Sequence, residues 1–138
     1  MKNNWKAILI LFSFILLSAW FYPVFLGNWA AMALPSFSSL PKNRILHLAI
    51  FSLNGSIGAL ICAFILAFPM GYFTRHKPII IGGTLGIVGE MITAYRFPIQ
   101  FNWFVGIITI AEYAAFILGC VLFTWCGYRV GNRRKRTG

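Results

Sequence analysis

Four long apolar stretches make up most of this chain and leave it few ways to fold in water. Hydrophobic residues account for 59% of the 138 residues and charged residues for 10%, which is too little polar surface to cover a water-soluble globule of this length. About 20 apolar residues form a helix of about 30 Å, which spans the hydrocarbon layer of a membrane. The sequence therefore predicts an all-α integral membrane protein.

Charged residues and prolines divide the chain into four predicted membrane-spanning helices. These spans are expected at about residues 7–26, 45–70, 79–95 and 103–127. Three prolines, Pro41, Pro78 and Pro98, fall in the connections, where a missing N–H costs little. Pro23 is expected to kink or end the first helix. No internal repeat or second domain is visible, so we predict a single four-helix bundle.

The first apolar stretch has some features of a secretory signal. Lys2 and Lys6 precede it, and an Ala-x-Ala pattern follows at Ala31 and Ala33. The apolar run is longer than the core of a typical signal, so we expect a retained helix.

The distribution of basic residues predicts the orientation of the bundle. With four spans, nine Lys and Arg residues lie on one side of the membrane and three on the other. The nine are Lys2, Lys6, Arg75, Lys77, Arg129, Arg133, Arg134, Lys135 and Arg136, and the three are Lys42, Arg44 and Arg96. Because cytoplasmic segments carry the excess of positive charge, both termini are predicted to be cytoplasmic, in a bacterial inner membrane.

The net charge of +10 also indicates a partner of opposite charge. Residues 128–138 form a basic cytoplasmic tail, in which Arg129, Arg133, Arg134, Lys135 and Arg136 are expected to contact anionic lipid headgroups. No recognition motif for nucleic acid accompanies these charges, so nucleic acid is not the predicted partner.

Small residues recur at helical spacing and predict how the helices pack. The stripes are Gly55, Ala59, Ala63, Ala67 and Gly71; then Gly82, Gly86 and Gly89; then Ala111, Ala115 and Gly119. Such stripes let helix backbones approach closely within lipid, where no hydrophobic force drives helices together. The tryptophans Trp5, Trp20, Trp29, Trp103 and Trp125 are expected at the membrane interface or facing lipid. The cysteines Cys62, Cys120 and Cys126 are expected to be free packing thiols.

The two acidic residues, Glu90 and Glu112, are the strongest functional candidates. Both lie inside apolar stretches, where a carboxylate is costly unless it is protonated, paired or facing water. Their distances from the predicted loops place both in the outer half of the membrane, on the same side as Arg44, His47 and Arg96. We therefore predict one polar, ligand-binding cluster beneath a basic rim. In the alternative interpretation, the glutamates satisfy Arg44, His47 or a backbone kink and only stabilise the bundle.

Several short motifs resemble the VanZ-like (teicoplanin-resistance) membrane protein family. Residues 43–48 are similar to the Asp-Lys-x-x-His start of a span in that family, and 86–90 to its Gly-rich helix ending in a glutamate. Glu112 followed by Gly119 is similar to its Asp-x-x-x-Asn-x-x-Gly pattern. Asn43, Thr93 and Phe116 depart from the family pattern. The resemblance implies a helical envelope protein associated with glycopeptide tolerance.

Three classes of function fit these features to different extents. An accessory or binding protein needs only the bundle and a polar pocket for a lipid, an envelope precursor or a protein partner, including a second copy of the chain. A small ion- or proton-coupled transporter would use Glu90 and Glu112 to exchange protons. An enzyme is not predicted, because no Ser-His-Asp or Cys-His constellation is readable and aspartate is absent. No cofactor or metal site is predicted.

Overall fold

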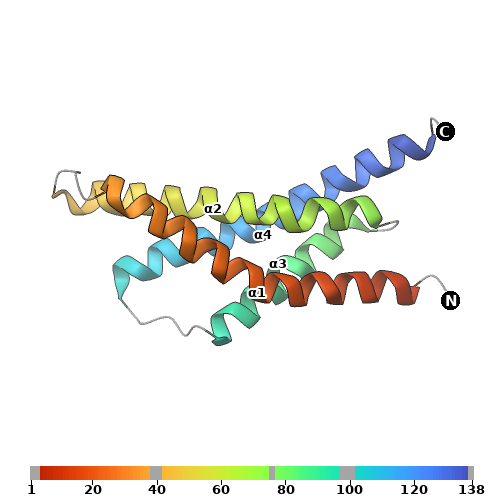
Figure 1. The fold of residues 1–138 in the computed structure, drawn as a ribbon, viewed down its shortest axis with the longest axis horizontal. Coiled ribbons are helices and arrows are strands. Elements are labelled where there is room, and N and C mark those ends of the chain that lie inside the picture. Colours follow the sequence, from red (N-terminus) through yellow and green to blue (C-terminus); the bar gives the residue numbers. More distant parts are fainter. Residues whose placement is uncertain (1–3, 38–41, 75–76, 97–101, 137–138) are drawn as a thin grey trace.

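The computed structural model describes residues 4–37, 42–74, 77–96 and 102–136, and these residues form four α-helices (Figure 1). The helices are α1 (Asn4–Phe37), α2 (Arg44–Phe73), α3 (Pro78–Arg96) and α4 (Trp103–Arg136). Each is long and apolar enough to cross a membrane. The predicted all-α fold with four helices of spanning length is therefore confirmed.

Two helices extend well beyond their predicted ends. α1 continues through Pro23 and also contains Pro35, so of the two outcomes predicted for Pro23, a kink or the end of the helix, the end is not observed. Figure 1 shows α1 changing direction near its middle, as a proline kink does. An apolar environment favours continuation of the helix, because backbone groups released there have no water to bond. α4 likewise continues through the predicted tail to Arg136.

Local capping residues define where α2, α3 and α4 begin. The Asn43 side-chain oxygen accepts hydrogen bonds from the backbone N–H groups of Ile45 (3.0 Å) and Leu46 (3.4 Å), as an N-cap residue does. The Asn102 side-chain oxygen accepts from the N–H of Phe104 at 3.2 Å in the same way. α3 instead begins with Pro78, whose missing N–H is not needed in the first turn.

The helices run up and down, so that both chain ends lie at the same end of the bundle (Figure 1). The most extensive contact is between α2 and α4, and α3 packs mainly on α4. α1 covers the other side by contacting α2 and α3. α3 is inclined to α2, and the two have few contacts (Figure 1).

Glycines allow the backbones of α2, α3 and α4 to touch. A Cβ atom on Gly71 would overlap the carbonyl of Thr124, and one on Gly127 would overlap the carbonyl of Phe68. On α3, a Cβ on Gly82 would lie 2.6 Å from the carbonyl oxygen of Cys120. Dispersion forces between such close surfaces stabilise helix pairs in lipid. The predicted role of the small-residue stripes on α2 and α3 is confirmed.

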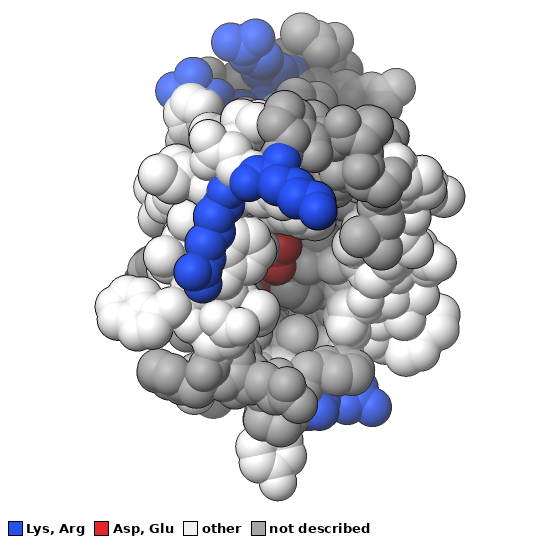
Figure 2. Space-filling view, turned by 90° about the vertical axis from the view of Figure 1, so that its left-hand side faces the viewer, with Lys and Arg blue, Asp and Glu red and all other residues white. Residues whose placement is uncertain are grey.

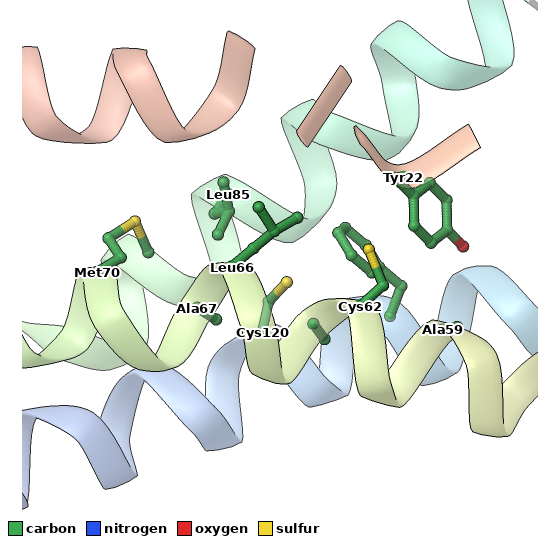
Figure 3. Packing of buried hydrophobic residues seen from close by; sticks show 10 residues of the cluster. Tyr22, Ala59, Cys62, Leu66, Ala67, Met70, Leu85 and Cys120 are labelled. Carbon is green, nitrogen blue, oxygen red and sulfur yellow. The ribbon is translucent and has the colours of Figure 1, made fainter. Parts of the chain in front are cut away.

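The core is a narrow seam of side chains between the helices (Figure 3). Its buried members are Tyr22, Ala59, Cys62, Ala63, Leu66, Ala67, Met70, Leu85, Phe116 and Cys120. The Tyr22 and Phe116 rings pack with centroids 4.2 Å apart, which joins α1 to α4. All three cysteines are free, as predicted, and Cys126 is only half-buried. Most other large apolar side chains face outward, as expected of a protein that lipid surrounds.

Candidate functional site

A basic pocket lies at the end of the bundle where α2 and α4 begin. It has a volume of about 310 Å³ and is lined by Lys42, Arg44, His47 and Phe104. The Lys42 and Arg44 side chains are exposed, whereas His47 is half-buried. The capped first turn of α2 fixes the positions of these residues, because Asn43 anchors the backbone between Lys42 and Arg44. Two flexible cations and an imidazole beside one hollow can bind an anionic group such as phosphate.

Aromatic rings line the inner side of this basic pocket. The His47 ring meets the Phe51 ring edge-on, with centroids 6.3 Å apart. Phe51 in turn meets Phe104 edge-on at 6.5 Å. The Nε2 atom of His47 is buried and has no hydrogen-bond partner among the described residues. His47 therefore packs on aromatic rings in this structure and does not reach a carboxylate.

A second cavity lies deeper, between α1, α2 and α4. Its volume is about 220 Å³, and its walls are Leu26, Trp29, Ala30, Phe51, Asn54, Gly55, Ile108 and Glu112. The Glu112 carboxylate lies directly against Gly55, in the space that a Cβ atom would fill. Trp29 donates a hydrogen bond from its indole Nε1 to the backbone carbonyl of Asn54 at 3.0 Å. This bond fixes α1 against α2 at the wall of the cavity.

Figure 2 views the molecule from the end where α2 and α4 begin. It shows acidic atoms at the bottom of a hollow, with basic side chains above and to the left of the opening. Of the two glutamates, Glu112 is half-buried and lines a cavity, whereas Glu90 is only 4% exposed. A ligand approaching from this end therefore meets basic groups first and a carboxylate beyond them.

Glu90 lies where all four helices converge. From α3, it lies near Tyr22 of α1, Cys62 of α2 and Cys120 of α4. The Tyr22 hydroxyl and the Glu90 carboxyl are near each other, but neither has a hydrogen bond of standard geometry within the described part of the chain. Glu112 also lies near the Tyr22 hydroxyl and the Glu90 carboxyl. The structure thus brings the two glutamates into one polar region that also contains Tyr22.

The two glutamates lie at different positions along α2. Gly55, beside Glu112, is eleven residues after the first residue of α2, or about 17 Å along that helix. Cys62, near Glu90, is eighteen residues along, or about 27 Å, and so lies past the middle of α2. The prediction measured depth from the end of α3 as if that end were level with the start of α2, but Figure 1 shows the end of α3 set back along the long axis of the bundle.

The predicted cluster of Arg44, His47, Glu90, Arg96 and Glu112 is therefore divided. Arg44 and His47 share the basic pocket, and Glu90 and Glu112 share the deeper region. Arg96 is exposed at the end of α3, which is set apart from the start of α2 in Figure 1. Within the described ranges, no ion pair joins either glutamate to a basic residue. The alternative in which Arg44 neutralises a glutamate is therefore not observed.

The predicted lipid-facing tail is partly described. Arg129 lies over the Trp125 ring with its guanidinium carbon 4.1 Å from the ring centroid, and both Arg129 and Arg133 are exposed on α4. The side chains of Arg134, Lys135 and Arg136 lie outside the described residues, as do Lys2 and Arg75.

The tryptophans divide into two groups. Trp5, Trp20 and Trp103 are exposed, as predicted, with 63–82% of their surface accessible. Trp29 and Trp125 are half-buried. Trp29 packs between α1 and α2 and lines the inner cavity, so it does not face lipid. The prediction that Trp29 lies at the membrane interface or faces lipid was based on residue type alone.

Sequence reasoning missed several residues of the inner region, namely Tyr22, Trp29, Phe51 and Asn54. α1 is apolar on all sides, so no periodicity distinguishes its buried face, which contains Ser18, Ala19 and Tyr22. One available signal was the buried glycine Gly55 one turn from Phe51, since a glycine in a span marks a close neighbour.

In the described part of the chain, no three His, Cys, Asp or Glu side chains converge in a way that could hold a metal ion. Comparison with protein-family models, curated proteins and solved structures finds no match to this chain. The assignment of a function therefore depends on the geometry of the two pockets and on the buried glutamates.

Proposed function

We propose that the protein is a small accessory binding protein of the bacterial inner membrane, with a pocket for the phosphate-bearing headgroup of a lipid or an envelope precursor. The observation that carries this proposal is the basic pocket of Lys42, Arg44 and His47 at one end of an apolar bundle. Lysine and arginine donate charge-assisted hydrogen bonds to phosphate, and lipid tails can lie along the exposed apolar sides of α2 and α4.

This role requires no chemistry by the protein itself. Binding needs a shaped pocket and complementary charge, whereas catalysis needs a nucleophile or a general base hydrogen-bonded to a reacting group. Glu112 lines a cavity without such a partner in the described structure. The VanZ-like resemblance of residues 43–48 and 86–90 supports an envelope-associated role of the same kind.

Retention of lipid by the purified protein tests the proposal. Native mass spectrometry of protein released from mild detergent is expected to show a bound phospholipid or envelope precursor. The double variant Lys42→Gln, Arg44→Gln should lose this species. The matched variant Lys6→Gln, Lys77→Asn removes two cations elsewhere, and asparagine suits the positive φ of Lys77 (49°). Equal retention in both variants, or no retained lipid in the unmodified protein, would reject a lipid ligand and leave a protein partner to be sought.

The proposed orientation places both termini in the cytoplasm and the basic pocket at the outer face. Single cysteines introduced at Asn43 and Asn132, in a background without native cysteines, should react with impermeant reagents from opposite sides. Reaction at Asn132 from the periplasm would reverse the orientation, and reaction of both from one side would reject the four-span topology.

A proton-coupled transporter is a second candidate, and the burial of Glu90 favours it. Glu90 is at the centre of the bundle, 4% exposed, without a hydrogen-bonded partner among the described residues. A membrane-embedded carboxyl group of this kind is suited to binding and releasing a proton.

Flux in liposomes distinguishes the two candidates. A carrier should move substrate under a pH gradient, and Glu90→Gln should abolish this flux while the protein stays folded. The binding protein proposed above should show no gradient-driven flux, with or without the substitution. Robust flux by the unmodified protein would therefore replace the leading proposal with transport.

A further inference from the structure

The inner cavity has a negative group on its wall and no positive group to balance it. Among the described residues that line this cavity, Glu112 is the only one with an ionisable side chain. Lys42 and Arg44 line the outer pocket instead, and the rings of Phe51 and Phe104 lie between the two pockets. A carboxyl group in an apolar bundle is stabilised when it is protonated, faces water or is paired with an opposite charge. The described residues that line the cavity supply no such charge, so the cavity with Glu112 ionised is complementary to a ligand that carries one.

The remaining walls have the composition of a site for an organic cation. Trp29 and Phe51 present aromatic rings, and Leu26 and Ile108 add apolar surface. The polar hydrogen of Trp29 is already donated to the Asn54 carbonyl, so this indole offers its ring and no donor for an anion. Aromatic rings attract cations through their negative faces, and alkylated ammonium groups are bound in proteins by such cages.

A metal ion fits these walls less well. Hard cations such as Ca²⁺ take six to eight oxygen ligands, whereas the side chains of this cavity provide oxygen only from Glu112 and Asn54. The volume of about 220 Å³ is also far more than a bare ion fills, and apolar atoms would surround it. An ammonium group with methyl or methylene substituents would fill the space and contact the apolar walls.

We propose that the cavity between α1, α2 and α4 binds a substituted ammonium group, with Glu112 as its counter-ion and Trp29 and Phe51 as its aromatic walls. This assignment rests on the proposed binding function and adds the chemical class of the group that the inner cavity binds. The ammonium group can come from a lipid headgroup or from a soluble amine.

The charge requirement can be tested on the unmodified protein. Choline and 3,3-dimethyl-1-butanol have nearly the same shape, but the second has carbon in place of the charged nitrogen. With ¹⁵N-labelled tryptophan, the indole signal of Trp29 is assigned by its loss in Trp29→Phe. In nanodiscs of phosphatidylglycerol, choline should shift this signal, whereas the neutral isostere should leave it in place. Equal shifts with both, or no shift up to about 10 mM choline, would overturn the proposal.

Variants then locate the binding groups. Glu112→Gln should weaken choline binding by at least about tenfold, and Phe51→Leu by a smaller factor. Phe12→Leu is the control for Phe51→Leu, because Phe12 is 58% exposed on α1 and lies outside the cavity. Unchanged binding in a folded Glu112→Gln protein would remove Glu112 from the site. Should that variant not fold, the comparison with the neutral isostere still decides.

Two further measurements are needed. The first distinguishes a lipid headgroup from a soluble amine as the source of the ammonium group, and the second distinguishes failure of the headgroup function from failure of the ammonium site. Phosphocholine binding more tightly than choline, with the gain lost in Lys42→Gln, Arg44→Gln, would identify a zwitterionic headgroup. Equal affinities would identify a soluble amine. Loss of lipid retention with intact choline binding would overturn the proposed headgroup function alone, whereas lipid retention without choline binding would overturn the ammonium site alone.

Discussion

The two halves of the α2–α4 pair are built differently although the same two helices form both. In the half that contains Gly71, Gly127 and Gly131, backbone meets backbone, and a Cβ on any of these glycines would crowd a backbone carbonyl oxygen of the other helix. In the half where α2 and α4 begin, a Cβ on Gly106 would meet no atom within 4 Å, and the Glu112 carboxylate fills the space beside Gly55. We call these the packed half and the open half.

The comparison shows how one helix pair can provide both stability and a site. Backbone contact in the packed half holds the helices together without hydrophobic drive, as lipid requires. Aromatic and acidic side chains in the open half hold the helices apart and leave cavities. Stability and ligand binding should therefore respond to different substitutions.

The largest expected effect is a loss of stability from filling a glycine contact in the packed half. Gly127→Val would force side-chain atoms into the Phe68 carbonyl, and overpacking of this kind costs about 1–3 kcal/mol or more of the free energy of unfolding. Gly106→Val, in the open half of the same helix, should change stability little. Unfolding in detergent followed by circular dichroism measures both. Equal losses would show that the two halves do not differ in packing.

The next effect concerns the boundary between the halves, where Glu90 faces Tyr22. A double-mutant cycle with Glu90→Gln and Tyr22→Phe should give a coupling energy of about 0.5–3 kcal/mol, because the two side chains interact in a buried region. The same cycle with Arg44→Gln should be additive, since Arg44 lines the separate outer pocket. Coupling of Glu90 to Arg44 and not to Tyr22 would restore the single cluster that the sequence predicts.

A smaller effect is expected in the open half from Trp29. Trp29→Phe keeps an aromatic ring but removes the hydrogen bond to the Asn54 carbonyl, which should lower stability by about 1 kcal/mol. Trp20→Phe is the matched control, because Trp20 is 63% exposed on the same helix. If both substitutions lower stability by the same amount, the hydrogen bond from Trp29 to α2 does not contribute to stability.

The smallest effect is expected at the rim of the open half. Asn43→Ala removes the N-cap of α2 and should cost about 0.5–1 kcal/mol, while Asn43→Ser retains a capping oxygen and should cost less. Thermal unfolding of the three proteins ranks them. Because Asn43 lies between Lys42 and Arg44, the alanine variant should also weaken lipid retention; unchanged retention would mean that the cap does not position the rim.

Much of the architecture follows from the sequence alone. The spacing of apolar stretches and charges is local information, and it predicted four helices whose ends agree within three residues for α2 and α3. The glycine and alanine stripe from Gly55 to Gly71 likewise predicted the face of α2 that packs, and all of its members are buried. Burial of one face every fourth residue leaves a periodic pattern that can be read without coordinates.

The tertiary structure decided what the polar residues do. Glu90 and Glu112 were identified as candidates because charge inside an apolar span is costly wherever the span packs. Their depth, their shared region with Tyr22 and their separation from Arg44 depend on where α3 ends relative to α2 and on the aromatic rings between the pockets. Neither leaves a periodic trace in the chain, because each arises from contacts between residues far apart in sequence. The sequence determined which side chains were costly, and only the packing of the helices determined which of them meet.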